Sequence, residues 1–322
     1  MKRVILLVCL LGLTTQCFCW GFFAHKRINY YAVFLLPPQM LLFYKPNIGF
    51  ITEHATDPDK RRYVIASEGA HHFIDIDHFG KYPYADLPHG WQDATNKFGE
   101  DTLLRYGIVP WYIQIMLGRL TKAFKEKNFL SILKNSAELG HYIADAHVPL
   151  HACENHNGQF TDQQGIHGFW ESRVPELLAD KKFDFFIGKA EYIKDPLKFT
   201  WERVLESGHA ADSVLTFEKK LSQQFTGDKK YSFERRNGLL IRQYSSEYTM
   251  AYDKMLNGMV ERRMRQSIFA IASFWYTAWV NAGQPDLSSL SKETFSENDQ
   301  KEFAKLNEDW KNNKGIKGRE HE

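Results

Sequence analysis

Hydrophobic positions along most of the chain recur with the period of an α-helix. Residues 22–35 and 109–127 carry apolar side chains at helical spacing, and the second segment starts close to a proline. Residues 129–147 predict another helix, and residues 199–225 predict one or two more. Because the alternating apolar and polar runs typical of strands are scarce, the chain is predicted to be all-α.

Three longer regions complete this predicted organisation. Residues 232–281 form the longest apolar-striped segment and predict two helices with a break near residues 257–258. Residues 54–101 are rich in Pro, Gly, His and Asp, which indicates irregular structure, and such long segments in compact domains are usually functional. Residues 288–322 are polar and are expected to form a surface helix and disordered chain without a catalytic role. The expected body is one domain, residues 20–287.

Residues 1–19 are predicted to be a signal peptide. They begin with Lys2 and Arg3, continue with an apolar run at residues 4–13 that is too short to span a bilayer, and end with small residues at the positions that a signal peptidase reads. Cleavage after Cys19 would export the protein to the periplasm or the medium. A lipid anchor is the less favoured alternative, because the residues directly before the two last cysteines are not small.

Loss of this segment changes what the composition allows. Three of the four cysteines lie in it, so the mature chain keeps only Cys153 and cannot form an intramolecular disulfide. Lys2 and Arg3 are lost as well, which takes the formal net charge from +2 to 0. A chain without a basic excess does not attract nucleic acid or anionic membranes by its bulk charge, so any such partner must be recognised locally.

Histidine and carboxylate residues concentrate in the middle of the chain. In "GHYIADAHVPLH", His141 and Asp145 are four residues apart, so both side chains project from one face of the predicted helix. His151 follows a proline at which this helix must end or kink. In "HGFWE", His167 and Glu171 repeat the four-residue spacing beyond a polar loop. Imidazole nitrogens combined with carboxylate oxygens are suited to zinc.

Isolated histidines need no such explanation. A single histidine on an apolar helix is usually a hydrogen-bonded core or surface residue, and His147 and His156, which lack a partner at the right spacing, are assigned to that class. Five ligand-type residues in one pattern are better explained by a metal site than by coincidence, since buried charge rarely goes unpaired.

Further candidate ligands lie upstream of these motifs. The stretch "ATDPDKRR" offers Asp57 and Asp59 followed by Arg62, and "HHFIDIDHF" offers His71, His72, Asp75, Asp77 and His78. The predicted mature chain begins "WGFFAH", with Trp20 first and His25 five residues later. A deprotonated α-amino group and its neighbouring carbonyl oxygen can chelate a metal. Taken alone, however, Trp20 is better explained as an anchor for the first helix.

In this order the motifs resemble those of the trinuclear-zinc phosphoesterases, namely bacterial zinc-dependent phospholipase C and the S-one/P-one single-strand nucleases. The shared pattern is an N-terminal Trp-Gly with a His five residues on, then Asp-x-x-Arg, His-Phe-x-Asp, His-x3-Asp-x5-His and His-x3-Glu. The resemblance covers residues 20–285, and every one of the nine ligand positions can be filled. It implies an all-α, single-domain helical bundle of this type with three zinc ions per chain.

The ligand sets implied by the resemblance can be written residue by residue. One zinc would be bound by Asp59, His72, His141 and Asp145, a second by His151, His167 and Glu171, and the third by the Trp20 amino nitrogen and carbonyl oxygen, His25 and the other oxygen of Asp145. Asp59 is preferred to Asp57 because it keeps the spacing to Arg62, and both remain candidates. His72 is preferred to His71 because it directly precedes Phe-Ile-Asp.

The implied reaction is hydrolysis of a phosphate ester by a zinc-bound hydroxide held between two ions that Asp145 bridges. Arg62 would clamp the phosphate, and Asp59 could orient the attacking water as well as ligate. Phe73 and Asp75 could stack on and hydrogen-bond a nucleobase, although packing in the core explains Phe73 about equally well.

The ligand set predicts the type of reaction better than the substrate. Glu171 is what the phospholipases use, whereas the short spacing from Trp20 to His25 is nuclease-like, and Phe23 stands where the phospholipases carry a Glu for choline. We therefore predict an exported zinc-dependent nuclease or nucleotidase acting on single-stranded nucleic acid or nucleotides. A phospholipase C acting on phospholipid head groups is the first alternative, and a non-catalytic zinc-binding surface module is the second. Neither an obligate protein partner nor an oligomeric state is indicated.

Overall fold

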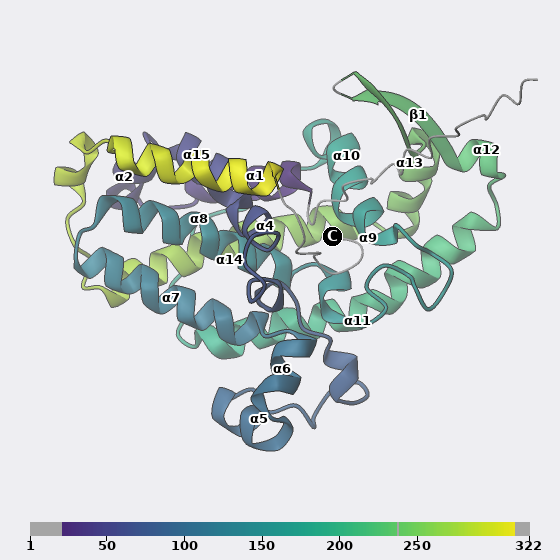
Figure 1. Cartoon of the computed structure of the whole chain (residues 1–322), viewed down its shortest axis with the longest axis horizontal. Coiled ribbons are helices and arrows are strands. Elements are labelled where there is room, and N and C mark those ends of the chain that lie inside the picture. Colours follow the sequence, from purple (N-terminus) through teal and green to yellow (C-terminus); the bar gives the residue numbers. More distant parts are fainter. Residues whose placement is uncertain (1–20, 237, 313–322) are drawn as a thin grey trace, which may run out of the picture.

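A computed structural model describes residues 21–236 and 238–312, and helices dominate this part of the chain (Figure 1). The helices are α1 (Phe22–Val33), α2 (Pro38–Tyr44), α3 (Ile48–Glu53), α4 (Asp57–Arg61), α5 (Trp91–Phe98), α6 (Glu100–Tyr106), α7 (Val109–Lys125), α8 (Phe129–Ala146), α9 (Ile166–Gly168), α10 (Val174–Lys182), α11 (Pro196–Ser222), α12 (Gly227–Lys230), α13 (Ser246–Met255), α14 (Met259–Asn281) and α15 (Glu297–Lys311). Single turns are η1 (His54–Thr56), η2 (Gly69–His71), η3 (Ile76–Phe79), η4 (Pro149–Ala152), η5 (Phe169–Arg173) and η6 (Ser288–Lys292), and the strands are β1 (Tyr231–Arg236) and β2 (Leu239–Tyr244). The predicted all-α class is confirmed.

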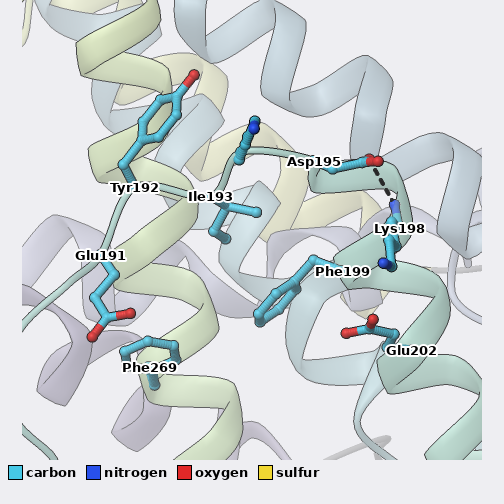
Figure 2. A pocket seen from close by; sticks show the side chains of 9 residues that line it. Glu191, Tyr192, Ile193, Asp195, Lys198, Phe199, Glu202 and Phe269 are labelled. Carbon is cyan, nitrogen blue, oxygen red and sulfur yellow. Dashed lines mark hydrogen bonds between the residues drawn. The ribbon is translucent and has the colours of Figure 1, made fainter.

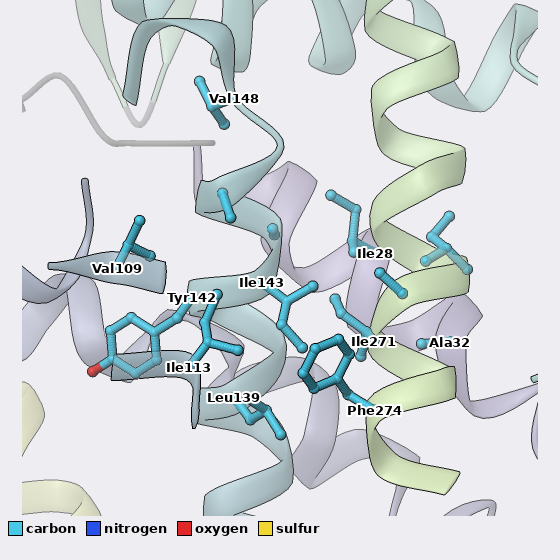
Figure 3. Packing of buried hydrophobic residues seen from close by; sticks show 14 of the residues in the cluster. Ile28, Ala32, Val109, Ile113, Leu139, Tyr142, Ile143, Val148, Ile271 and Phe274 are labelled. Atoms are coloured by element: carbon cyan, nitrogen blue, oxygen red, sulfur yellow. The ribbon is translucent and has the colours of Figure 1, made fainter. Parts of the chain in front are cut away.

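The core is built around α8, which contacts α1, α7 and α14. In Figure 3, Ile143 of α8 lies close to Ile28 of α1 and to Ile271 and Phe274 of α14, and Leu139 follows along the same helix; all five side chains are buried. Each large apolar side chain buried in this way contributes about 1.5–3 kcal/mol to folding. This packing fixes the position of the helix that carries two of the predicted metal ligands.

Local sequence signals explain where the helices α7 and α8 begin. The side chain of Asn128 caps α8 by accepting a hydrogen bond from the backbone N–H of Ser131 at 2.8 Å. Pro110 lies in the first turn of α7, where its missing N–H costs nothing. The predicted ranges 109–127 and 129–147 therefore agree with α7 and α8 to within two residues.

Helix α1 approaches α8 closely at Gly140. Asn29 of α1 donates a hydrogen bond from Nδ2 to the carbonyl oxygen of Ala137 at 3.0 Å. A Cβ atom on Gly140 would lie only 2.2 Å from Oδ1 of Asn29, so glycine is required for this contact. One turn away along α1, the ring of His25 stacks on His141 with 3.9 Å between the centroids. The close approach therefore places two predicted ligands side by side.

Gly140→Ala is expected to lower the free energy of unfolding by about 1–3 kcal/mol, because the added methyl group overlaps Asn29 in a close-packed interior. Gly118→Ala is the matched control, since Gly118 is exposed on α7 and its Cβ would meet nothing within 4 Å. Alanine there is expected to raise the free energy of unfolding by up to about 1 kcal/mol through helix propensity. Urea unfolding of both variants measures the difference, and equal effects would contradict the proposed steric role of Gly140.

The predicted helix pair at residues 232–281 is wrong in its first part. Residues 231–236 and 239–244 pair as the antiparallel strands β1 and β2, and the helices α13 and α14 follow them within the described part of this segment. The predicted break is confirmed at Gly258, which has a left-handed φ of 70°. The dipeptide Asn237-Gly238 is a strong sequence signal for a hairpin, and it outweighs the helical spacing of the neighbouring apolar residues.

The remaining expectations are met in part. Residues 54–101 consist mostly of short turns, as predicted, but α5 within them is a regular helix. Residues 199–225 are spanned for most of their length by the single helix α11. Helix α15 lies on the surface without a buried residue, as expected for residues 288–322. No helix in the described ranges is long and apolar enough to cross a membrane. The predicted signal peptide, residues 1–19, lies outside the described residues.

Candidate metal centre

Buried histidine and carboxylate side chains gather around the C-terminal end of α8. The residues are His25 of α1, Asp59 of α4, His72 after η2, His141 and Asp145 of α8, His151 of η4, His167 of α9 and Glu171 of η5. Each of them is at most 1% exposed. They are the predicted ligands with the exception of Trp20, which lies outside the described residues. Segments that are far apart in the sequence therefore meet at one place.

The first cluster consists of Asp59, His72, His141 and one oxygen of Asp145. Nδ1 of His72 lies 3.0 Å from Oδ2 of Asp145 and 3.0 Å from Nε2 of His141. Nε2 of His141 lies 3.6 Å from Oδ1 of Asp59. Ligand atoms held about 2.0–2.1 Å from a tetrahedral ion such as zinc are about 3.3 Å apart. The spacing of these atoms therefore fits one small cation.

The second cluster consists of His151, His167 and Glu171. Nε2 of His167 lies 3.1 Å from Nε2 of His151 and 3.1 Å from Oε2 of Glu171. The remaining distance, from Nε2 of His151 to Oε2 of Glu171, is 3.6 Å. Three ligands at this spacing leave room in the coordination sphere of a tetrahedral ion for a water or a substrate oxygen.

Asp145 links the first cluster to a third group of ligands. Its Oδ2 atom lies 3.2 Å from Nε2 of His141, whereas its Oδ1 atom lies 3.3 Å from Nε2 of His25. The two oxygens of one carboxylate thus face two different histidines. This arrangement is what a carboxylate that bridges two cations requires. His25, His141 and Asp145 form a third group of neighbouring ligand atoms, in which His25 and Oδ1 of Asp145 are the members that the family resemblance assigns to the third ion.

Several of these buried atoms have no hydrogen-bond partner among the described residues. They are both ring nitrogens of His25, both carboxylate oxygens of Asp59 and Oδ1 of Asp145. Burying carboxylate oxygens without hydrogen-bond partners is costly, and a bound cation offsets that cost. The donor set, the spacing and these unpaired atoms agree, so the clusters can hold metal ions.

The electrostatics of the cluster also favour cation binding. Burial raises the pKa of Asp59 above its usual range, although Arg62 and His25 oppose this effect. Burial and the charge of His141 lower the pKa of His25 to about 4, so this imidazole is neutral and free to ligate at neutral pH. Burial acts against protonation of His72, but Asp145 and Glu68 together outweigh burial and raise the pKa of His72 to about 9. A metal ion would replace that shared proton.

Backbone carbonyl groups orient three of the histidines. In each case the Nδ1–H group donates to a carbonyl oxygen: His141 to Ala55 at 2.9 Å, His151 to His72 at 2.7 Å and His167 to His156 at 3.0 Å. With Nδ1 protonated, Nε2 keeps its lone pair, and Nε2 is the atom that faces the clusters. The fold therefore fixes the tautomer of these three side chains.

The helix that carries the second cluster is less regular than predicted. His167 lies in α9, but residues 169–173 form the π-helical turn η5 instead of continuing the α-helix. The side chains of His167 and Glu171 nevertheless meet, as their four-residue spacing predicts. Single π-helical turns inside helices are rare and are frequently found at functional sites.

The structure distinguishes between the alternative ligands that the sequence leaves open. Asp57 pairs with Nδ1 of His54 at 2.5 Å and with Nζ of Lys60 at 2.8 Å, away from the clusters. His71 stacks on Tyr112 with 3.6 Å between the ring centroids. Asp59 and His72, which the family spacing favours, are the ones that face the other ligands.

The residues predicted to contact the phosphate and the base, Arg62, Phe73 and Asp75, are not members of the three ligand clusters. Nη2 of Arg62 lies 3.8 Å from Oδ1 of Asp59, so its guanidinium borders the first cluster, and the residue is 2% exposed. Phe73 and Asp75 are buried and belong to none of the clusters. Phe73 packs tightly against Gly107, where a Cβ would lie 2.6 Å from the phenyl ring. This contact agrees with the packing alternative, and a substrate role for both residues stays a prediction.

The two histidines that were assigned no metal role lie outside the clusters. Nδ1 of His147 donates to the carbonyl oxygen of Ile143 at 2.7 Å. The carbonyl oxygen of His156 accepts the hydrogen bond from Nδ1 of His167 and so helps to orient that ligand. Sequence reasoning missed this role and that of Ala55, because a backbone acceptor leaves no signal in the residue type.

A separate surface cavity of about 270 Å³ lies between the segment that leads into α11 and helix α14. Figure 2 shows Glu191, Tyr192 and Phe269 on one side of it and Phe199 and Glu202 of α11 on the other. None of the predicted ligands lines this cavity. It therefore adds nothing to the metal centre.

Comparison with known proteins adds no assignment. No protein-family model matches the chain, and no curated protein matches it.

Proposed function

We propose that this chain is an exported zinc-dependent phosphodiesterase that binds three zinc ions and belongs with the trinuclear-zinc phosphoesterases. The preferred substrates are single-stranded nucleic acid or nucleotides. The proposal combines the order of the sequence motifs with the convergence of the predicted ligands in space. Nitrogen and oxygen donors without a thiolate, at tetrahedral spacing, suit zinc better than the larger oxygen-only shells of calcium and magnesium.

One observation carries the proposal, namely the position of Asp145. Its two oxygens lie 3.2 Å from His141 and 3.3 Å from His25, in a setting where the carboxylate is fully buried. A structural metal site needs one cation and a closed ligand shell. Neighbouring cations joined by one carboxylate are instead the arrangement that enzymes use to displace a phosphate oxygen. Three neighbouring groups of ligands therefore support catalysis more than a structural role.

The residues of the chain can be assigned roles in this reaction. When bound, zinc lowers the pKa of a coordinated water to about 7 and thereby supplies a nucleophile near neutral pH. Asp59 has two carboxylate oxygens without a hydrogen-bond partner in the described chain, so one can ligate while the other orients the attacking water. The Arg62 guanidinium, beside Asp59, presents donors that match phosphate oxygens. Burial of the ligands excludes bulk water and strengthens these interactions.

The substrate class rests on sequence features. The spacing from Trp20 to His25 and the presence of Phe23 in place of a choline-binding glutamate favour a nucleic acid or nucleotide over a phospholipid. Glu171, in contrast, is shared with the phospholipases. Because the formal net charge of the mature chain is 0, the anionic substrate must be bound mainly by the metal centre and Arg62.

A parallel assay tests this function. The mature protein, loaded with zinc, is incubated with single-stranded DNA, RNA, 3′-mononucleotides and phosphatidylcholine, and a chelator-treated sample serves as the control. Hydrolysis of the nucleic acids or nucleotides, lost on chelation and restored by zinc, is the expected result. Hydrolysis of phosphatidylcholine alone would instead identify a phospholipase C. Inertness toward all four substrates with zinc bound would indicate a non-catalytic binding module.

A further inference from the structure

His72 differs from the histidines that backbone carbonyls orient. It faces the first cluster with Nδ1, which lies 3.0 Å from Oδ2 of Asp145. Its other nitrogen, Nε2, points to the side chain of Glu68, with 3.7 Å between Nε2 and Oε1. That distance is longer than a hydrogen bond, but Nε2 has no nearer hydrogen-bond partner among the described residues. The Glu68 carboxylate is therefore the acceptor toward which a proton on Nε2 would be attracted.

The position of Glu68 is fixed by a buried network that is not part of the metal clusters. Arg61 donates from Nε to Oε2 of Glu68 at 3.0 Å and from Nη1 to Oε1 of Glu138 at 2.8 Å. The hydroxyl of Tyr142 donates to Oε1 of Glu68 and accepts from Nη2 of Arg61 at 3.1 Å. Glu68 is 4% exposed. A side chain with this many partners cannot turn away from His72 without breaking the network.

The network also pairs the Glu68 carboxylate with a permanent positive charge, because Nε of the Arg61 guanidinium lies 3.0 Å from Oε2 of Glu68. A carboxylate behind a metal-binding imidazole fixes the tautomer and the ring orientation, and it makes the ligating nitrogen more basic. The Glu68 side chain, held by Arg61, thus orients the ring of His72 in the way that the backbone carbonyl group of Ala55 orients the ring of His141.

We propose that Glu68 is a positioning residue that holds His72 with its proton on Nε2 and its lone pair on Nδ1, directed at the first metal ion. This inference rests on the metal centre of the proposed function but not on the identity of the substrate. In other metal sites, loss of a carboxylate that lies behind a metal-binding histidine lowers the affinity for the metal by about 10–100-fold. We expect loss of the Glu68 carboxylate to lower the affinity of the first cluster for its ion by the same factor.

Glu68→Gln and Glu138→Gln form a matched pair, because each removes one negative charge that faces Arg61 but only Glu68 faces His72. The full-length mature variants are loaded with zinc and titrated with a chelator, and the zinc retained per chain is measured. Glu68→Gln is expected to release one zinc at a free-zinc level about 10–100-fold higher than the wild type does. Glu138→Gln is expected to retain zinc as the wild type does, although both variants lose some stability.

A second readout does not depend on the variants. In ¹⁵N spectra of the zinc-loaded wild type with labelled histidine, His72 is expected to carry its proton on Nε2. A wild type that binds zinc while the two variants behave alike, or a His72 that is protonated on Nδ1, would overturn this inference and leave the proposed function standing. A wild type that binds no zinc would remove both proposals.

Discussion

Asp145→Asn is expected to abolish phosphodiester hydrolysis and to lower the zinc content of the chain from three ions to about one. Asp145 offers one oxygen to the first cluster, 3.2 Å from Nε2 of His141, and the other oxygen to Nε2 of His25 at 3.3 Å. An amide keeps the shape but loses the charge that holds neighbouring cations together. The second cluster does not contain Asp145 and should keep its ion. Activity should fall by at least about 10³-fold, the scale of removing a principal electrostatic group.

Metal analysis of the purified variant, combined with hydrolysis of single-stranded DNA, checks this expectation. Glu138→Gln is a suitable control, since Glu138 is a buried carboxylate on the same helix that pairs with Arg61 and belongs to no cluster. That control should keep its metal and most of its activity. An Asp145→Asn protein with full zinc content and wild-type rates would show that Asp145 does not bridge two ions.

A single extra residue ahead of Trp20 is expected to remove the third zinc and to lower activity by at least about 10²-fold. The extension would turn the free α-amino group into an amide, which is a poor ligand. Among the described residues, His25 and one oxygen of Asp145 are the ligands of the third cluster that the first cluster does not also use. The third ion therefore depends on further ligands from the N-terminus. Trp20 itself lies outside the described residues, and this prediction rests on the sequence motif.

The measurement compares a chain that begins at Trp20 with one that carries an additional N-terminal glycine. Proteolytic removal of the glycine should restore both the third ion and the activity, which separates the loss of a ligand from damage to the fold. Equal activity and equal metal content in the two chains would mean that Trp20 only anchors the first helix.

Much of the metal centre could be predicted from the sequence because its spacing is local. His141 and Asp145 lie one helical turn apart, and so do His167 and Glu171, so a helix alone brings each pair together. The choice between Asp57 and Asp59 needed the motif or the structure. Both residues lie in α4, and only the packing of that helix decides which carboxylate faces the cluster.

The parts that sequence could not predict depend on contacts between distant segments or on backbone atoms. Glu68 and Arg61 meet Tyr142, more than seventy residues later, and no periodicity records that contact. The carbonyl oxygens of Ala55 and His156 orient ligands irrespective of residue type. The β1–β2 hairpin is a different case, because its Asn-Gly turn signal is local and present in the sequence, next to apolar residues that also have helical spacing.

The number of zinc ions per chain tests the central claim most directly. Native mass spectrometry of the mature protein, begun at Trp20 and purified without chelator, measures that number on the intact chain. Three zinc ions per chain are predicted, held by the three clusters around Asp145. One ion or none, in a folded protein supplied with zinc, would contradict the trinuclear centre and the reaction derived from it.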